Sequence, residues 1–351
     1  MSSTAYELAA EIPDYFVSSP FWQYERMLGH GTYGLAILVG QKGRGSAGFR
    51  MVIKVALDSG GTQLRNEISW LKQLNGAMHI VRMIASMDPQ SPFLDNNRYP
   101  PMSWVFDALV RIRGPLLAME YINNGNLTTL FSRIEERGLH MPNRMLWSLF
   151  LCMVRACIGM AYPIGAALTS PISTLEMIPP GRTPGLLKHG DIALRNIMIG
   201  TPGEDKAGLE KEHITGHVFK LIDFGAAEAA PPGLSNNIFE ISEALASFIT
   251  MKPYIIFNQV GMHKGFKTRG AYLLSGPEGD PYPWLDTDLS DLMAECMYLD
   301  PERRPTLQQA LDRASRAVLD KTPDMFVNPD DETDEAIRNF AQEFILDADS
   351  I

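Results

Sequence analysis

The stretch KHGDIALRNIMIG, residues 188–200, places an acid and an amide at a spacing that could serve phosphoryl transfer. The Asp191 carboxylate could accept or orient the proton of a hydroxyl group. Asn196, five residues later, offers a neutral oxygen ligand for Mg²⁺. Both residues precede the apolar run IMIG, so an ordinary turn that leads into a buried strand is the alternative interpretation.

A second acid, Asp223, lies in the sequence FKLIDFGAA, where it ends an apolar run and precedes Phe224 and Gly225. A hard carboxylate at the end of a strand can bridge a metal ion and the phosphates of a nucleotide. Acids at strand ends before glycine are common. Asp223 therefore indicates a metal site only together with other residues.

Three glycines in LGHGTYGLA, Gly29, Gly31 and Gly34, keep the spacing G-x-G-x-x-G. Glycine has no Cβ and therefore lets backbone amides approach phosphate groups closely. Here the glycines join two apolar runs, so we expect them in a strand-turn-strand hairpin. This position excludes the dinucleotide-binding fold, in which such glycines join a strand to a helix.

Lys54 lies within the β-branched run MVIKVA, where a lysine requires an anionic partner or a path to water. The following helix, TQLRNEISWLKQL, carries Glu67 on the same face as Leu71, whereas Arg65 and Lys72 point elsewhere. Glu67 is therefore the acid predicted to pair with Lys54 and to aim it at phosphate oxygens. A lysine on an edge strand that points to water is the alternative.

Hydrophobic periodicity indicates which elements position these residues. Short apolar runs between glycine-rich turns, from Trp22 to Tyr121, predict a small antiparallel sheet with one helix. The pattern becomes helical over residues 126–140 and 145–162, which predicts a second, mostly helical lobe. The acidic tail from Lys321 carries an apolar helical face, which we expect to pack on the protein or on a partner.

The composition is that of a soluble globular protein, with 45% hydrophobic and 21% charged residues. A formal net charge of −10 opposes binding to nucleic acid or to an anionic membrane. Three cysteines without paired spacing, and an acidic N-terminus without a secretory pattern, predict a cytoplasmic protein. The apolar stretch 145–169 holds Arg155 near its middle, which predicts a buried helix and not a membrane span.

Five motifs follow one another in the order found in protein kinases: the glycine-rich hairpin, the strand lysine, the helix glutamate, H-x-D-x-x-x-x-N and D-F-G. The chain resembles the protein kinase family from Phe21 to Leu319, and its tail and late motif are similar to those of fungal kinase-like proteins. The resemblance implies an α+β, bilobal protein-kinase-like fold with a small antiparallel sheet lobe and a larger helical lobe. Its parts would be an N-terminal lead at 1–20, an N-lobe at 21–122, a C-lobe at 123–320 and an acidic tail with an amphipathic helix at 321–351.

The resemblance also implies a role for each motif residue. In chain order, Gly29, Gly31 and Gly34 would cover the ATP phosphates, Lys54 would hold the α and β phosphates, Glu67 would position Lys54, Asp191 would be the catalytic base, and Asn196 and Asp223 would bind Mg²⁺.

A further set would hold the adenine base. Val52 and Met198 would enclose the base, and the backbone of the hinge from Met119 to Ile122, which includes Glu120, would meet its edge. Met119 would occupy the gatekeeper position at the rear of the site.

The chain departs from the family around the catalytic loop. Gly190 stands where most kinases have an arginine that receives an activation-loop phosphate, and residues 226–234 contain no hydroxyl group. Any activity is therefore predicted to be independent of loop phosphorylation. The run IALRN after Asp191 is similar to the tyrosine-kinase loop, but the choice between Ser/Thr and Tyr stays undecided.

A second departure concerns the peptide-docking platform. No A-P-E sequence follows Gly225, so Arg304 lacks its family partner, and Glu228 is the predicted replacement. The helical run NNIFEISEALASFIT could replace the family's central buried helix, with Asn237 at its aspartate position. His189, Leu71 and Phe224 match the family's internal hydrophobic spine and are expected to support geometry.

The resemblance implies an ATP- and Mg²⁺-dependent phosphotransferase that transfers the γ-phosphate to a protein hydroxyl. HGD and the short segment after D-F-G are also similar to aminoglycoside and choline kinases, so a small-molecule acceptor is the second hypothesis. Missing platform elements favour a third, a nucleotide-binding pseudokinase scaffold, whereas retention of Lys54, Asp191, Asn196 and Asp223 opposes it. The sequence does not specify an oligomeric state.

Overall fold

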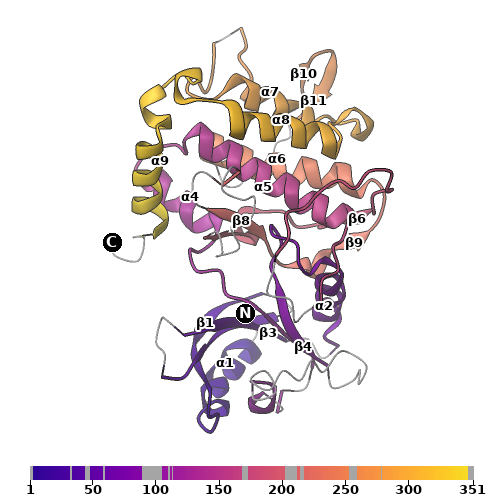
Figure 1. Ribbon diagram of the computed structural model, residues 1–351, viewed down its shortest axis with the longest axis vertical. Helices are drawn as coiled ribbons and strands as arrows, with labels where there is room; N and C mark the ends of the chain where they lie inside the picture. Colours follow the sequence, from indigo (N-terminus) through magenta and orange to yellow (C-terminus); the bar gives the residue numbers. More distant parts are fainter. Residues whose placement is uncertain are drawn as a thin grey trace.

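The computed structural model is a mixed α+β structure, with an antiparallel sheet at one end of the molecule and most helices at the other (Figure 1). It describes residues 3–31, 34–43, 48–57, 60–88, 105–109, 111–112, 114–167, 173–201, 212–213, 217–252, 259–277 and 279–346.

The sheet has five strands in the order β1-β2-β3-β5-β4, and every neighbouring pair is antiparallel. The strands are β1 (Trp22–His30), β2 (Gly34–Gln41), β3 (Arg50–Ala56), β4 (Met83–Met87) and β5 (Leu116–Glu120). The antiparallel sheet predicted from the apolar runs is confirmed. Helix α2 (Thr62–Leu74) follows β3, where one helix was expected.

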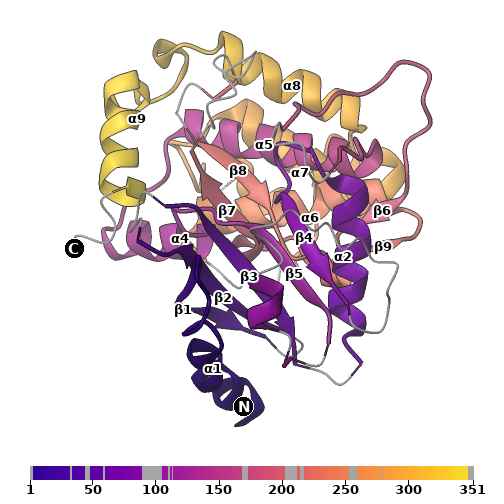
Figure 2. The same cartoon turned by 60° about the horizontal axis from the view of Figure 1, so that its bottom comes forward.

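Side-chain alternation gives the sheet two different faces. On β3, Ile53 and Val55 are fully buried in a cluster that includes Ile12 of helix α1 (Ser3–Tyr15), which lies beside the sheet in Figure 2. Val52 and Lys54, the alternate residues of β3, line a cavity on the other face. The N-terminal segment is therefore an amphipathic helix that covers one face of the sheet.

The helical part of the molecule surrounds α5 (Asn143–Ala161). Its other helices are α4 (Leu127–Glu136), α6 (Gly233–Thr250), α7 (Thr287–Cys296), α8 (Leu307–Asp320) and α9 (Asp334–Ala341). Short strands form three antiparallel pairs, β6 (Leu187–Lys188) with β9 (Glu228–Ala229), β7 (Ile197–Gly200) with β8 (Val218–Leu221), and β10 (Gly261–His263) with β11 (Phe266–Thr268). Short turns of 3₁₀ helix at η2 (Leu194–Asn196) and η3 (Phe224–Ala226) adjoin these strands.

Among the described residues, α5 is the one helix long and apolar enough to cross a membrane, and 94% of its apolar window is buried inside the protein. Its central charge, Arg155, donates hydrogen bonds to the carboxylate of Glu212 and to the carbonyl oxygen of Glu176. The buried charge is therefore compensated within the protein. Helix α5 is the core helix of the helical part, as its central arginine predicted.

The tail packs on its own chain. Helix α9 and the π-helical turn η8 (Gln342–Leu346) bury Ile337, Phe344 and Ile345 in the main hydrophobic core. Before them, the buried Glu332 carboxylate accepts hydrogen bonds of 2.7 Å and 2.9 Å from the backbone N–H groups of Asn143 and Arg144. An acid at these N–H groups satisfies donors that the first turn of α5 cannot satisfy itself.

Candidate functional site

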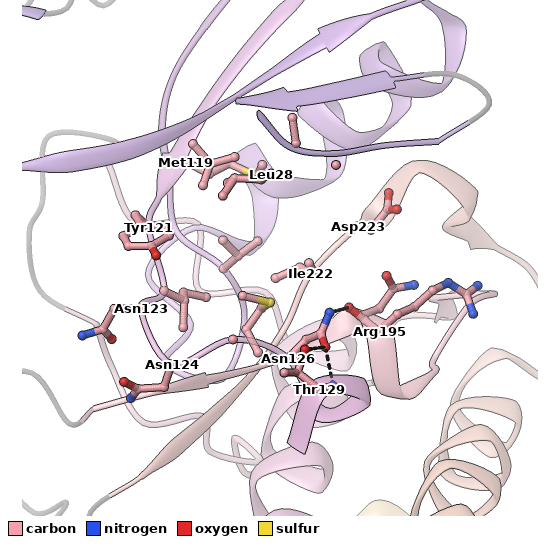
Figure 3. A pocket seen from close by; sticks show the side chains of 18 of the residues that line it. Leu28, Met119, Tyr121, Asn123, Asn124, Asn126, Thr129, Arg195, Ile222 and Asp223 are labelled. Atoms are coloured by element: carbon pink, nitrogen blue, oxygen red, sulfur yellow. Dashed lines mark hydrogen bonds between the residues drawn. The ribbon is translucent and has the colours of Figure 1, made fainter. Parts of the chain in front are cut away.

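A cavity of about 650 Å³ lies between the inner face of the sheet and the helical part (Figure 3). It has the size of a small-molecule site. Most of the residues predicted for nucleotide and metal binding line it, although they come from segments far apart in the chain. They are Gly29, Gly31, Gly34, Val52, Lys54, Glu67, Met119, Glu120, Ile122, Asn196, Met198 and Asp223.

The predicted pair of Lys54 and Glu67 is present, and it has a third member. Lys54 Nζ lies 2.6 Å from Glu67 Oε2 and 2.7 Å from Asp223 Oδ1. Burial lowers the pKa of Lys54, but the two carboxylates more than offset this effect and raise the pKa above its usual value. Lys54 is therefore a fixed positive charge on the wall of the cavity.

Asp223 is held in an uncommon backbone conformation, with φ of 65°. A non-glycine residue in this left-handed region requires support from its surroundings. Here Asn66 of α2 donates hydrogen bonds of 3.0 Å and 2.9 Å to the carbonyl oxygens of Gly225 and Ala227. Helix α2 thus holds the segment after Asp223 and also supplies Glu67.

The charge of Asp223 is stabilised by its neighbours. Burial raises the pKa of its carboxyl group, but Lys54 more than offsets this effect and lowers the pKa below its usual value. Asp223 therefore carries a negative charge near neutral pH. A charged carboxylate on a cavity wall is a suitable ligand for a hard cation.

The glycine-rich hairpin leaves space where the resemblance places phosphate groups. A Cβ atom on Gly29 or Gly31 would meet no atom within 4 Å, whereas one on Gly34 would lie 3.3 Å from Lys54 Cε. Packing within the protein therefore does not require the first two glycines. Open space at these positions lets a ligand approach the backbone of the hairpin closely.

Within the loop from 189 to 196, the side chain of Asn196 is hydrogen-bonded to Asp191. Asn196 Nδ2 donates hydrogen bonds of 2.9 Å to Asp191 Oδ2 and of 2.9 Å to the Asp191 carbonyl oxygen. Arg195 forms an ion pair with the other carboxylate oxygen of Asp191. Because Asn196 uses its amide nitrogen here, its amide oxygen is the atom that could coordinate a cation.

Asp191 differs from the other predicted residues because it does not line the cavity. Its two partners, Arg195 and Asn196, line it instead, and the Asp191 side chain is 35% exposed beside them. It is therefore accessible to an acceptor molecule without contacting the cavity itself.

His189 supports this loop as a neutral side chain. Its Nε2–H group donates to the Ile222 carbonyl oxygen at 3.0 Å, and its Nδ1 accepts from the Asp191 backbone N–H at 3.2 Å. Burial lowers the pKa of His189 to about 4. The ring also packs edge to face on Phe224, with centroids 4.7 Å apart. These contacts connect the Asp191 loop to the Asp223 segment.

The predicted hinge borders the cavity. The Glu120 side chain lines the cavity, but it accepts hydrogen bonds from the Arg82 N–H at 2.8 Å and from Lys220 Nζ at 2.6 Å. Met119 and Val52 are direct partners across β5 and β3, so both lie on the sheet face that borders the cavity. Met198, on β7, lines the cavity from the helical part.

The local geometry at position 190 requires glycine. Gly190 has φ of 80°, and a Cβ atom there would lie 2.9 Å from the Ala226 carbonyl oxygen. Side chains rarely adopt this backbone conformation, and the contact is too short. The segment after Asp223 thus occupies the place where an arginine side chain would begin.

We expect Gly190→Arg to lower the free energy of unfolding by about 1–3 kcal/mol, because it adds both backbone strain and a clash with Ala226. Chemical denaturation measures this change. Gly181→Arg is the matched control, since Gly181 has φ of 70° but a Cβ atom there would meet no atom within 4 Å. Equal losses for the two variants would show that the Ala226 contact contributes nothing.

Helix α6 anchors the start of the Asp191 loop through Asn237. Asn237 Oδ1 accepts a hydrogen bond from the His189 backbone N–H at 2.9 Å, and its Nδ2 donates to the Leu187 carbonyl oxygen at 2.9 Å. Asn237 is fully buried. The run that contains it forms the largely buried helix α6, and the Asn237 amide holds the backbone on both sides of Lys188.

The predicted pairing of Arg304 with Glu228 is wrong. Arg304 donates to the carbonyl oxygens of Tyr298 at 2.8 Å and Ser235 at 2.9 Å, and its guanidinium lies over the Phe239 ring. Glu228 lies exposed on β9. Backbone carbonyl groups and an aromatic face take the place of a carboxylate, and none of them was identifiable from the local sequence.

Several cavity residues were not predicted. Leu28 directly precedes the first glycine of the glycine-rich hairpin, and Ile222 directly precedes Asp223. Two further residues, Ile345 and Leu346, reach the cavity from the tail. Asn126 caps α4 through Thr129 and donates to the Arg195 carbonyl oxygen at 3.3 Å (Figure 3). The apolar face of the tail was recognisable in the sequence, but its contact with the cavity was not.

Comparison of the chain with known protein families gives no match, and no curated protein matches it significantly.

Proposed function

We propose that this protein is an ATP- and Mg²⁺-dependent phosphotransferase with a bilobal, protein-kinase-like fold. The observation that carries the proposal is the three-way contact of Lys54 with Glu67 and Asp223 on the wall of the cavity. The Lys54 ammonium group, held between two carboxylates, is positioned to donate to phosphate oxygens. The second carboxylate, that of Asp223, is suited to bind a metal ion. A protein hydroxyl is the proposed acceptor.

The residues around the cavity fit the groups that the reaction needs. Asp223 and Asn196 offer a carboxylate and an amide oxygen, which are the ligands that Mg²⁺ prefers, and the cavity is large enough for a nucleotide. When bound, Mg²⁺ would neutralise charge on the phosphates. Lys54 would donate to phosphate oxygens in exchange for part of its contact with Asp223.

In the proposed step, Asp191 orients the acceptor hydroxyl and takes its proton. A bond forms between the acceptor oxygen and the γ-phosphorus, and the bond from that phosphorus to the β,γ-bridging oxygen breaks, so that ADP leaves. Arg195 and Asn196 hold the Asp191 carboxylate in place through its two oxygens. Fixed positions of these groups lower the entropic cost of the step.

A small-molecule acceptor is the second candidate. Between η3, which ends at Ala226, and α6, which begins at Gly233, the chain has room only for the short strand β9. This segment is too short for the platform on which a peptide is expected to dock.

The three buried cysteines among the described residues are free thiols, which supports a reducing, cytoplasmic location.

Transfer of radiolabelled γ-phosphate to a cell extract, separated into protein and small-molecule fractions, tests both candidates. Label in protein would support the protein kinase, and label in small molecules would support the second candidate. Absence of label from both fractions, with nucleotide binding retained, would favour a nucleotide-binding scaffold without transfer activity.

Nucleotide binding has its own test at Ala36, which lines the cavity and is the direct partner of Lys54 across β2 and β3. Ala36→Phe would fill the space proposed for the base and is expected to abolish the thermal shift by Mg·ATP. Wild-type protein should be stabilised by about 2.7 kcal/mol when the ligand is at 100 times its Kd. Ala36→Ser should respond like the wild type, and an undiminished shift for Ala36→Phe would place the nucleotide elsewhere.

A further inference from the structure

A second group of chemically reactive side chains lies outside the cavity. His79, Cys152 and His213 are buried, and their potential ligand atoms all lie within 4.8 Å of one another. They come from the loop between α2 and β4, from the middle of α5, and from the stretch between β7 and β8. None of the three lines the cavity or takes part in the proposed phosphoryl transfer.

Two of the three separations within this group match those around a tetrahedral metal ion, and the third is at most 4.8 Å. His79 Nε2 lies 3.1 Å from His213 Nε2, and Cys152 Sγ lies 3.5 Å from His213 Nε2. Zinc bonds of about 2.0–2.1 Å to nitrogen and about 2.3 Å to sulfur place tetrahedral ligands about 3.3–3.6 Å apart. A single ion could therefore contact all three atoms once His79 and Cys152 come within this range of each other.

We propose that His79 Nε2, Cys152 Sγ and His213 Nε2 bind a Zn²⁺ ion, with a fourth position left to a water molecule. Two imidazole nitrogens and a thiolate are the ligands that Zn²⁺ selects over Mg²⁺ or Ca²⁺, which prefer oxygen. The bound ion would connect the loop before β4 to the core helix α5 and to the segment that carries His213.

Glu176 provides the outer support that metal-binding histidines usually have. Its carboxylate is 1% exposed and accepts 2.7 Å and 2.8 Å hydrogen bonds from His79 Nδ1 and from the His79 backbone N–H. A donor bond from Nδ1 fixes the ring so that Nε2 faces the other two ligand atoms. Glu176 lies in the segment between α5 and β6.

Arg155 holds the two segments that complete the site. It lies one turn beyond Cys152 on α5, pairs with the carboxylate of Glu212, and donates to the Glu176 carbonyl oxygen at 2.6 Å. Glu212 immediately precedes His213. The buried arginine therefore fixes the backbone next to His213 and the backbone of Glu176, which orients His79. These contacts hold the site in place from α5 before an ion binds.

The surroundings also favour a cation at this place. The Glu176 carboxylate lies 2.7 Å from His79 Nδ1, on the side of the ring away from the other two ligand atoms. This carboxylate and the thiolate form of Cys152 would together balance the charge of a bound Zn²⁺ ion.

A second candidate group, His263 with Asp291 and Glu295, serves as a comparison. There Lys264 Nζ already lies 2.5 Å from Asp291 Oδ2 and 2.7 Å from Glu295 Oε1, so a cationic side chain neutralises both acids. This surface group also has only one nitrogen ligand. We therefore expect zinc at the buried group and not at His263.

Elemental analysis of the purified full-length chain tests the site. We expect zinc in an amount equimolar with the protein, at least tenfold less in Cys152→Ser and His213→Ala, and wild-type amounts in Cys157→Ser and His263→Ala. Cys157 is a buried free thiol on the same helix and is therefore the matched control. Asp191→Asn should retain zinc fully, which separates this test from the proposed transfer activity.

A spectroscopic test begins with the wild-type protein, so its first result does not depend on how well a variant folds. Wild-type protein freed of metal by a chelator and titrated with Co²⁺ should show a thiolate-to-cobalt charge-transfer band and the intense visible bands of a tetrahedral ion. The charge-transfer band should persist in Cys157→Ser and be absent from Cys152→Ser. Absence of both zinc and the cobalt bands in the wild type, or a charge-transfer band that survives in Cys152→Ser, would overturn the proposal.

Discussion

Asp191→Asn is expected to reduce γ-phosphate transfer by about 10²–10⁴-fold, the usual contribution of a general base. Asparagine keeps the size of the side chain and can still bond to Arg195 or Asn196, but it cannot take a proton from an acceptor hydroxyl. Because Asp191 does not line the cavity, nucleotide binding should be unchanged. Transfer from radiolabelled ATP and the thermal shift by Mg·ATP measure the two effects separately.

The control for this substitution is Glu228→Gln. Glu228 is an exposed acid on β9, paired in register with Lys188 close to the Asp191 loop, and it does not line the cavity. It should retain full transfer activity. Two results would contradict the assignment: wild-type activity in Asp191→Asn, or a loss of nucleotide binding as large as its loss of activity.

Lys54→Met is expected both to abolish transfer and to lower the free energy of unfolding by about 3–5 kcal/mol. Lys54 is the cation that compensates Glu67, whose side chain is 1% exposed. Removal of one partner leaves a buried carboxylate without its counter-charge, which costs more than the pair itself contributes. Urea denaturation measures the stability, and radiolabelled ATP measures the transfer.

The double variant Lys54→Met/Glu67→Gln separates the two effects. It removes both charges of the buried pair, so most of the lost stability should return, whereas transfer should stay absent because no cation remains to align the phosphates. If the double variant were no more stable than the single one, Glu67 would not be the uncompensated charge. Transfer activity in either variant would exclude Lys54 as the phosphate ligand.

Local pattern in the sequence was sufficient to predict many features of the fold and part of the site. Alternating apolar residues specified the antiparallel strands, because successive side chains point to opposite faces of a sheet. The helical period of the segment after β3 placed Glu67 on the same face as Leu71, and the pairing of Glu67 with Lys54 is present at 2.6 Å. These predictions succeeded because they depend on contacts within a few elements of the chain.

Other features depend on how distant elements pack, and the sequence alone did not reveal them. Asp223 reaches Lys54 from 169 residues away, the Ala226 carbonyl excludes a side chain at Gly190, and Arg304 pairs with backbone oxygens. The buried group of His79, Cys152 and His213 likewise has no recognisable spacing, since its members lie in three separate segments. Periodicity encodes the local geometry of one element, whereas these contacts are decided by the relative placement of whole elements, which only the packed core determines.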